Sequence, residues 1–254
     1  MGQSPPIELQ LSRSALVLDI DGTLAPIHED PDAVRVPAAT LELLERLVAR
    51  AARVAVATGR SLDDAMRLVP VDGLWYAASH GMHMRAPDGT EDIDQRALDA
   101  RPHLDMARTL AQTVGWRHED KTHAITLHFR HLATPELTAR QMRAQMATVL
   151  DPRALTVHDA RMALEIRPTG ARTKADAVRM LASDLDLDVC MVMGDDLTDL
   201  DAFNALDDLN GVHGLRIAVG SDEIPESLAG AAEFVLDGQH EVAGFLARLL
   251  ESDS

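Results

Sequence analysis

Two carboxylates, Asp19 and Asp21, stand two positions apart directly after the apolar residues 15–18. Alternate side chains of a strand point the same way, so we expect both carboxylates to face one site. One carboxylate can attack phosphorus or carbon as a nucleophile, and the other can give up and take back a proton. Because open α/β sheets bind ligands at the carboxyl ends of their strands, this pair predicts an enzyme active site.

Three more polar clusters follow predicted strands or begin predicted helices. They are Thr58-Gly59-Arg60 after residues 53–57, Lys174 at the start of a helix, and Gly194-Asp195-Asp196-Leu197-Thr198-Asp199 after residues 189–193. Each cluster alone has an ordinary explanation, because Asp-Gly forms turns and an aspartate before a helix caps its first turn. Together, in this order along a parallel sheet, the clusters favour one composite site.

Phosphoryl transfer through an aspartyl phosphate on Asp19 is the chemistry that suits these residues. Asp21 would act as general acid and base, while Lys174 and the Thr58 hydroxyl would hold the charged phosphoryl group. Hard oxygen ligands suit Mg²⁺, and the candidate ligands are the carboxylates of Asp19, Asp21, Asp195, Asp196 and Asp199. For Asp196 and Asp199 two roles stay open, direct ligation or support of metal-bound water and of Lys174.

The elements that must position these residues alternate between strand and helix, which predicts a doubly wound parallel sheet, an α/β fold. The expected strands are 15–20, 53–57, 74–78, 189–193, 215–219 and 233–236, and the expected helices are 37–50, 62–68, 174–185, 197–206 and 241–250. The middle of the chain differs, with helices 95–114 and 135–149 and strands 124–129, 155–158 and 163–166. We therefore expect a core domain at 1–98 and 168–254, with a small α+β cap domain inserted at 99–167.

Composition narrows the class of partner. A formal net charge of -17 over 254 residues disfavours binding to nucleic acids and to anionic membranes. Residues 1–10 lack the basic start and long apolar stretch of a signal peptide, and no apolar run approaches the ~18 residues of a membrane span. Cys190, the only cysteine, lies in an apolar run and is predicted to be a buried hydrophobe. We expect a monomeric, cytoplasmic protein that binds a small molecule.

Several segments together resemble a known family. Asp19-Ile20-Asp21-Gly22-Thr23 matches the DxDGT signature of haloacid-dehalogenase-superfamily phosphatases, and Gly194-Asp195-Asp196-Leu197-Thr198-Asp199-Leu200-Asp201-Ala202-Phe203 resembles the GDDxTDEDAF segment of trehalose-6-phosphate phosphatases. Further matches are Ser79-His80-Gly81, Lys121 with Leu127-His128-Phe129-Arg130, and Leu164-Glu165-Ile166-Arg167-Pro168. The similarity runs from about Leu16 to Val235, with Leu200 standing where the family has an acidic residue.

The resemblance implies a Mg²⁺-dependent phosphatase with a mobile cap that releases inorganic phosphate. It also implies that Lys121, His128, Arg130 and Glu165 of the cap hold the sugar hydroxyls or the phosphate. We further expect Arg60 and His80 to bind the substrate. For His128 and Arg130 a solvated strand face is the alternative, because both alternate with apolar residues.

Hydrolysis of trehalose 6-phosphate is the leading functional hypothesis. The alternatives are a phosphatase for another sugar or cyclitol phosphate, a phosphomutase, and a catalytically silent sugar-phosphate sensor. The complete set of Asp19, Asp21, Lys174 and Asp195 argues against the sensor.

Overall fold

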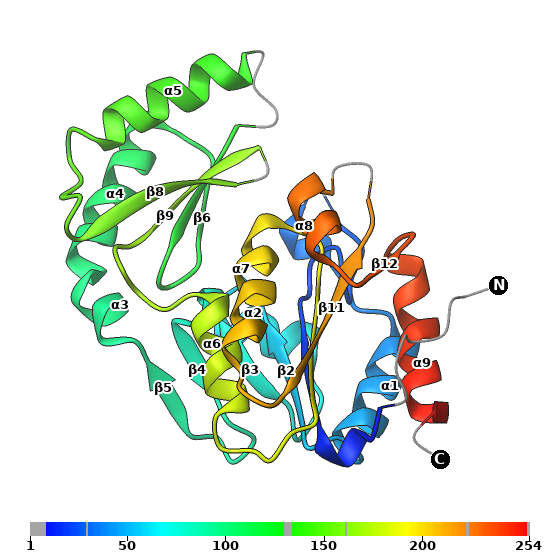
Figure 1. Cartoon of the computed structure of the whole chain (residues 1–254). Coiled ribbons are helices and arrows are strands. Elements are labelled where there is room, and N and C mark those ends of the chain that lie inside the picture. The colour runs from blue at the N-terminus through cyan, green and yellow to red at the C-terminus, as the bar shows by residue number, and fades with distance from the viewer. Residues whose placement is uncertain (1–8, 29, 130–133, 161, 222–223, 253–254) are drawn as a thin grey trace. The chain divides into compact units, whose positions relative to one another are not determined.

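The computed structural model describes residues 9–28, 30–129, 134–160, 162–221 and 224–252. Arg130 therefore lies outside the described residues. The chain divides into two compact units, Met1–Asp92 with Arg172–Ser254, and Ile93–Ala171 (Figure 1). Among the described residues, no helix is both long enough and apolar enough to cross a bilayer.

The larger unit is built on an eight-stranded sheet with the order β12-β11-β10-β1-β2-β3-β4-β5. Its strands are β1 (Ser14–Leu18), β2 (Arg53–Ala57), β3 (Trp75–Ala78), β4 (His83–Arg85), β5 (Glu91–Ile93), β10 (Val189–Gly194), β11 (His213–Val219) and β12 (Phe234–Leu236). The pairs from β12 through β3 are parallel, and β4 runs antiparallel to β3. The predicted α/β architecture is confirmed, with the order of strands reversing around β1.

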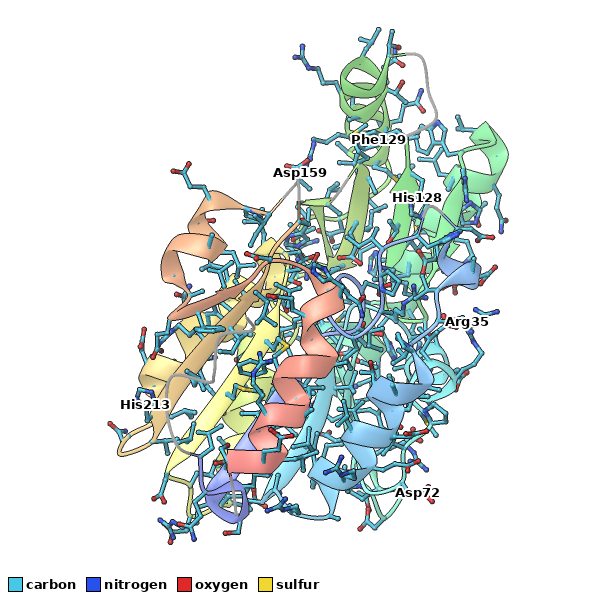
Figure 2. All side chains as sticks on the ribbon, turned by 90° about the vertical axis from the view of Figure 1, so that its right-hand side faces the viewer. Arg35, Asp72, His128, Phe129, Asp159 and His213 are labelled. Atoms are coloured by element: carbon cyan, nitrogen blue, oxygen red, sulfur yellow. The ribbon has the colours of Figure 1, made fainter. Side chains whose placement is uncertain are left out.

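Helices cover both faces of this sheet because its central strands are apolar on both sides. They are α1 (Ala38–Val48), α2 (Leu62–Leu68), α6 (Lys174–Ala182), α7 (Leu197–Ala205), α8 (Glu226–Ala231) and α9 (Val242–Ser252). Leu16 and Leu18 of β1 pack with residues of α1, α2 and α9, whereas Ala15 and Val17 pack with α6, α7 and α8. Helices α1 and α9 lie side by side on the first face (Figure 2). Cys190 is buried on the second face, as predicted, and burial raises the pKa of its thiol to about 12.

Three expectations for the larger unit were wrong. The first strand ends at Leu18 rather than at residue 20, so Asp19 and Asp21 lie in the turn that follows it. Strands β4 and β5 were missed because His-Met-Arg and Glu-Asp-Ile are three residues long and mostly polar. Of the two, β5 forms the edge of the sheet, where short polar strands are typical. Helix α8 was missed because its six residues carry little helical periodicity.

The smaller unit is an antiparallel sheet with the order β6-β7-β9-β8 and three helices. Its elements are α3 (Gln95–Asp99), α4 (Arg101–Val114), β6 (His118–Asp120), β7 (Ile125–His128), α5 (Pro135–Met146), β8 (Leu155–Ala160) and β9 (Ala163–Pro168). Ile125, Leu127, Leu164 and Ile166 form the apolar face and pack against α4 and α5. The opposite face carries the residues that alternate with them, including Thr126 and Glu165, which are register partners.

The single helix expected over residues 95–114 is in fact two helices that meet at Ala100. Pro102 explains the break, because it has no backbone N–H to donate to the carbonyl of Leu98, whereas a proline is tolerated in the first turn of a new helix. Strand β6 was also missed, since His-Glu-Asp contains no apolar residue.

Candidate active site

The site in the larger unit lies where its central strands end. The N–H of Asp19 donates to the carbonyl of Met193, 3.0 Å away, and so continues the pairing of β1 with β10 by one residue. Similarly, the N–H of Thr58 donates to the carbonyl of Ala77, 2.9 Å away, just beyond β2. Because neighbouring parallel strands end at the same edge, the residues after β1, β2 and β10 meet there.

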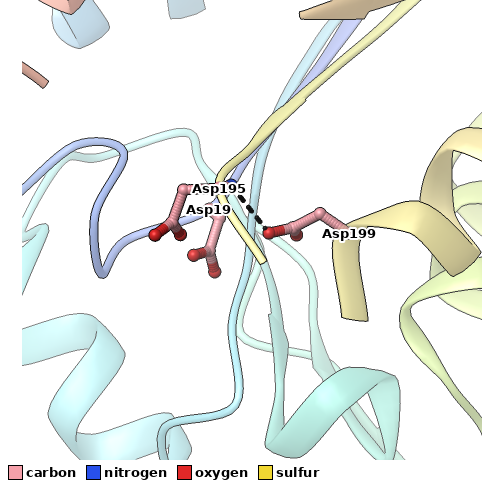
Figure 3. Close-up of side chains that lie close together, drawn as sticks. All are labelled: Asp19, Asp195 and Asp199. Carbon is pink, nitrogen blue, oxygen red and sulfur yellow. Dashed lines mark hydrogen bonds between the residues drawn. The ribbon is translucent and has the colours of Figure 1, made fainter. Parts of the chain in front are cut away.

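A buried lysine joins two of the predicted carboxylates. Lys174 Nζ donates to Oδ1 of Asp19 at 2.8 Å and to Oδ1 of Asp199 at 2.7 Å. All three side chains are almost wholly inaccessible to solvent. Asp19, Asp195 and Asp199 each offer a carboxylate oxygen within 4.8 Å of the others, and Figure 3 shows the three side chains together. This cluster of hard oxygen donors could hold a metal ion.

One ammonium among several buried carboxylates shapes the electrostatics of the cluster. Burial raises the pKa of Asp19 well above its ordinary value, although Lys174 opposes the shift. Burial raises the pKa of Asp199 in the same way. Burial also disfavours charged Lys174, but the facing charges of Asp19 and Asp199 outweigh that penalty and raise its pKa. The site therefore holds excess negative charge, which a cationic ligand would relieve.

Without a metal ion, the raised pKa of Asp19 should make the protein lose stability as pH increases. A raised carboxyl pKa contributes stability that is complete below the ordinary value of 3.8 and is lost as pH rises through the folded-state value. We expect the melting temperature of Asp19→Asn, in chelator, to exceed that of the wild type by a margin that grows as pH rises above the ordinary carboxyl pKa of 3.8. The control is Asp201→Asn, which changes an exposed carboxylate. A difference in melting temperature that stays constant or shrinks as pH rises would contradict a raised pKa for Asp19.

The remaining carboxylates of the α7 segment have distinct roles. Asp196 caps α7, because its Oδ1 accepts from the N–H and the hydroxyl of Thr198, each at 2.7 Å. Asp199 accepts through Oδ2 from the N–H groups of Asp195 at 3.0 Å and Asp196 at 3.1 Å. Both oxygens of Asp199 are thus hydrogen-bonded, one to Lys174 and one to this loop. The pKa of Asp196 is lowered, because Lys174, Thr198 and His80 together outweigh the opposing effect of burial.

The absence of a side chain at Gly22 leaves room for the carboxylate of Asp195. A Cβ atom added at Gly22 would lie 2.1 Å from Oδ2 of Asp195, and Gly22 has φ of +79°. Only glycine therefore allows this turn to approach the carboxylate so closely.

Substitution of Gly22 should therefore displace Asp195. We expect Gly22→Ala to lower kcat by about 100-fold, the usual cost of misplacing a reacting group by about 1 Å. The matched control is Gly211→Ala, because Gly211 has nearly the same φ, +77°, and no atom within 4 Å of an added Cβ. Gly211→Ala bears the same backbone strain and should retain activity within about twofold. Equal losses in the two variants would show that strain, and not the Asp195 contact, explains the effect.

Asp21 is held by an arginine of the loop after β2. Arg60 donates through Nε and Nη2 to the two carboxylate oxygens of Asp21, both at 2.7 Å. The N–H of Arg60 also donates to Oγ1 of Thr58 at 3.2 Å, which orients the buried hydroxyl. Arg60 is buried, while Asp21 is 39% exposed. The structure thus brings Arg60 onto the second carboxylate of the motif.

The candidate residues of the smaller unit gather on the polar face of its sheet. Lys121 Nζ donates to Oε1 of the buried Glu165 at 3.0 Å, and Nε2 of His128 lies 3.5 Å from Oε2 of Glu119. Sequence reasoning did not single out Arg167, whose Nε lies 3.6 Å from Oε2 of Glu165. Its position two residues after Glu165 on a strand was the available signal.

Comparison with known proteins identifies the family. The trehalose-phosphatase family pattern matches residues 17–240. The chain belongs to this family. A trehalose-phosphate phosphatase of Mycobacterium tuberculosis is 35% identical over 245 residues, which cover 92% of this chain and 61% of the relative. The corresponding protein of Mycobacterium leprae is 32% identical over 259 residues, covering 95% and 58%. This trehalose-phosphatase-family chain thus spans about three fifths of the length of these curated relatives.

Solved structures show the same fold for this family member. The C-terminal domain of trehalose-6-phosphate phosphatase from C. albicans superimposes with a TM-score of 0.77 at 22% identity, covering 96% of this chain and 94% of that one. A trehalose-6-phosphate phosphatase related protein gives a TM-score of 0.72 at 24% identity, covering 93% and 97%. The superposition includes the inserted α+β unit because nearly the whole of each chain is covered.

Proposed function

We propose that this chain hydrolyses trehalose 6-phosphate to trehalose and inorganic phosphate, as a monomer in the cytoplasm. The observation that carries the proposal is the buried cluster of Asp19, Lys174, Asp195 and Asp199 in a chain of the trehalose-phosphatase family. The relatives described above are trehalose-phosphate phosphatases, which supports the same substrate for this chain.

In the first step a carboxylate oxygen of Asp19 attacks phosphorus, and the bond from phosphorus to the sugar oxygen breaks. Asp21 donates its proton to that oxygen, so trehalose leaves as the neutral alcohol. Lys174 already donates to Oδ1 of Asp19 and balances charge beside the nucleophile. The hydroxyl of Thr58 holds a phosphoryl oxygen.

In the second step water attacks the phosphorus of the aspartyl phosphate while Asp21 takes its proton. The bond to Asp19 breaks, and inorganic phosphate leaves. Asp21 thus ends each cycle protonated and ready to act as the acid again. Arg60 restrains the half-exposed carboxylate of Asp21 through two hydrogen bonds and favours its charged form, which is the form that takes the proton from water.

Mg²⁺ fits the donor set of this site, since it prefers hard oxygen ligands and few protein carboxylates. Asp19 and Asp195 are the proposed direct ligands, because both oxygens of Asp199 accept other hydrogen bonds, and Asp196 caps α7 and lies outside the cluster of Asp19, Asp195 and Asp199. When bound, Mg²⁺ would neutralise the phosphoryl oxygens and help to orient them. Asp199 then acts through Lys174 and through the loop that carries Asp195.

We infer that the α+β unit is a cap that recognises the sugar. Lys121, His128 and Glu165 supply hydrogen-bonding groups from one sheet face, and Arg130 follows β7 in the sequence. A disaccharide is distinguished by many such hydrogen bonds, because the wrong sugar leaves some of them unmade.

Phosphate release from a panel of substrates tests the proposal. The panel contains the 6-phosphates of trehalose, glucose, sucrose and mannose together with p-nitrophenyl phosphate, each with Mg²⁺ and each with chelator. We expect Mg²⁺-dependent release with strong preference for trehalose 6-phosphate. Preference for another member would show that the α+β unit recognises that sugar phosphate instead. No phosphate release from any member would refute the phosphatase reaction itself.

Glu165→Gln should separate recognition of the sugar from chemistry. Loss of a charged hydrogen bond costs about 1.5–3 kcal/mol, so kcat/KM for trehalose 6-phosphate should fall by about 10–100-fold. Activity toward p-nitrophenyl phosphate should stay within about twofold, because this substrate presents no sugar hydroxyls. Glu42→Gln, an exposed change on α1, is the control. Equal losses on both substrates would contradict a role in sugar recognition.

A further inference from the structure

The turn Ser79–Gly81, which follows β3, has an unusual backbone. Ser79, His80 and Gly81 have φ of 48°, 58° and 94° in succession. Among the described residues only Thr122 and Met162 join Ser79 and His80 as non-glycine residues with positive φ. Such conformations cost free energy and persist where surrounding contacts enforce them, often at functional sites.

This turn contacts two segments of the candidate active site. The N–H of Ser79 donates to the carbonyl of Arg60 at 2.7 Å, and the N–H of His80 donates to the carbonyl of Thr58 at 2.8 Å. On its other side, a Cβ atom added at Gly81 would lie 2.5 Å from the carbonyl oxygen of Thr173. The turn therefore lies between the loop of Thr58 and Arg60 and the residue that precedes Lys174.

The imidazole of His80 fills the space next to Gly59. It is 6% exposed, and a Cβ atom added at Gly59 would lie 2.6 Å from its Cε1 and 2.7 Å from its Nε2. The ring thus packs against the backbone between Thr58 and Arg60. It is also close enough to Asp196 to affect that carboxylate electrostatically.

We propose that His80 is a positioning residue, whose imidazole holds the Thr58–Gly59–Arg60 backbone in register with Lys174. Through that backbone the imidazole fixes the position of the Thr58 hydroxyl, and through Arg60 it fixes the position of the Asp21 carboxylate. The inference rests on the proposed phosphatase function, but it differs from the direct contact with the substrate that the sequence predicts for His80.

The substitution His80→Asn tests this role, because asparagine tolerates positive φ while lacking the outer ring atoms. We expect His80→Asn to lower kcat by about 100-fold with KM changed less than about threefold. The loss should be equal for trehalose 6-phosphate and p-nitrophenyl phosphate, and the melting temperature should stay within a few degrees. His83→Asn, on the neighbouring β4, is the matched control and should retain full activity.

A double-mutant cycle with Gly59→Ala gives a second, independent test. In the wild type the new methyl group collides with the imidazole, so Gly59→Ala should also lower kcat by about 100-fold. In the His80→Asn background the colliding atoms are absent, and Gly59→Ala should lower kcat by less than about threefold. This cycle remains informative even if His80→Asn alone lowers the melting temperature.

Specific outcomes would overturn the inference. They are a kcat within about threefold of wild type for His80→Asn, a loss confined to trehalose 6-phosphate, or equal effects of Gly59→Ala in both backgrounds. A wild-type protein that hydrolyses p-nitrophenyl phosphate but not trehalose 6-phosphate would refute the proposed substrate only. The role of His80 would then be decided on the aryl phosphate.

Discussion

Asp19→Asn is expected to lower phosphate release by at least about 10⁴-fold while leaving the protein folded. An amide is a poor nucleophile, so the aspartyl phosphate cannot form. Stability should not suffer, because the substitution removes one of several buried carboxylates that share the ammonium of Lys174. Initial rates with p-nitrophenyl phosphate and melting temperatures in chelator measure the two effects.

Asp201→Asn is the control for this substitution, since it makes the same chemical change at an exposed position of α7. It should keep kcat within about twofold of wild type. Activity of Asp19→Asn near that of the wild type would refute the assignment of the nucleophile. A loss of activity accompanied by unfolding would refute the electrostatic account of the cluster.

Lys174→Met should both abolish activity and destabilise the larger unit. Breaking a buried ion pair leaves unpaired charge in the interior, which typically costs about 3–5 kcal/mol. Here two carboxylates, Asp19 and Asp199, would lose their shared donor. Denaturant unfolding in chelator measures the change in the free energy of unfolding.

The control is Arg179→Met on the same helix α6, whose pairs with Asp176 and Asp208 are exposed. Arg179→Met should lower the free energy of unfolding by less than about 1 kcal/mol. The double variant Asp19→Asn with Lys174→Met should be more stable than Lys174→Met alone, because it buries one carboxylate fewer. If Lys174→Met lowers the free energy of unfolding by no more than Arg179→Met does, Lys174 is not a buried, charged partner of the two carboxylates.

Much of the larger unit could be predicted because its signals are local. Strands β1, β2 and β10 are continuous apolar runs, and such runs indicate strands buried on both faces. Strand β4 carries no such run, since it is defined by pairing with its neighbours in the sheet and not by its own residues. The break at Ala100 could also have been predicted from the sequence, because Pro102 is a local signal.

The sequence by itself determined which residues could do chemistry and where along the chain the strands that carry them lie, because residue type and apolar patterning are properties of short segments. Only the tertiary structure decided how those residues are paired. The cap that Asp196 forms on α7 is local to residues 196–198. By contrast, Arg60 holds Asp21 and Asp199 holds Lys174, although both carboxylates looked alike as candidate ligands. The difference arises because hydrogen-bond partners 39 or 25 residues apart meet only after the sheet has formed. Spacing along the chain carries no information about that geometry.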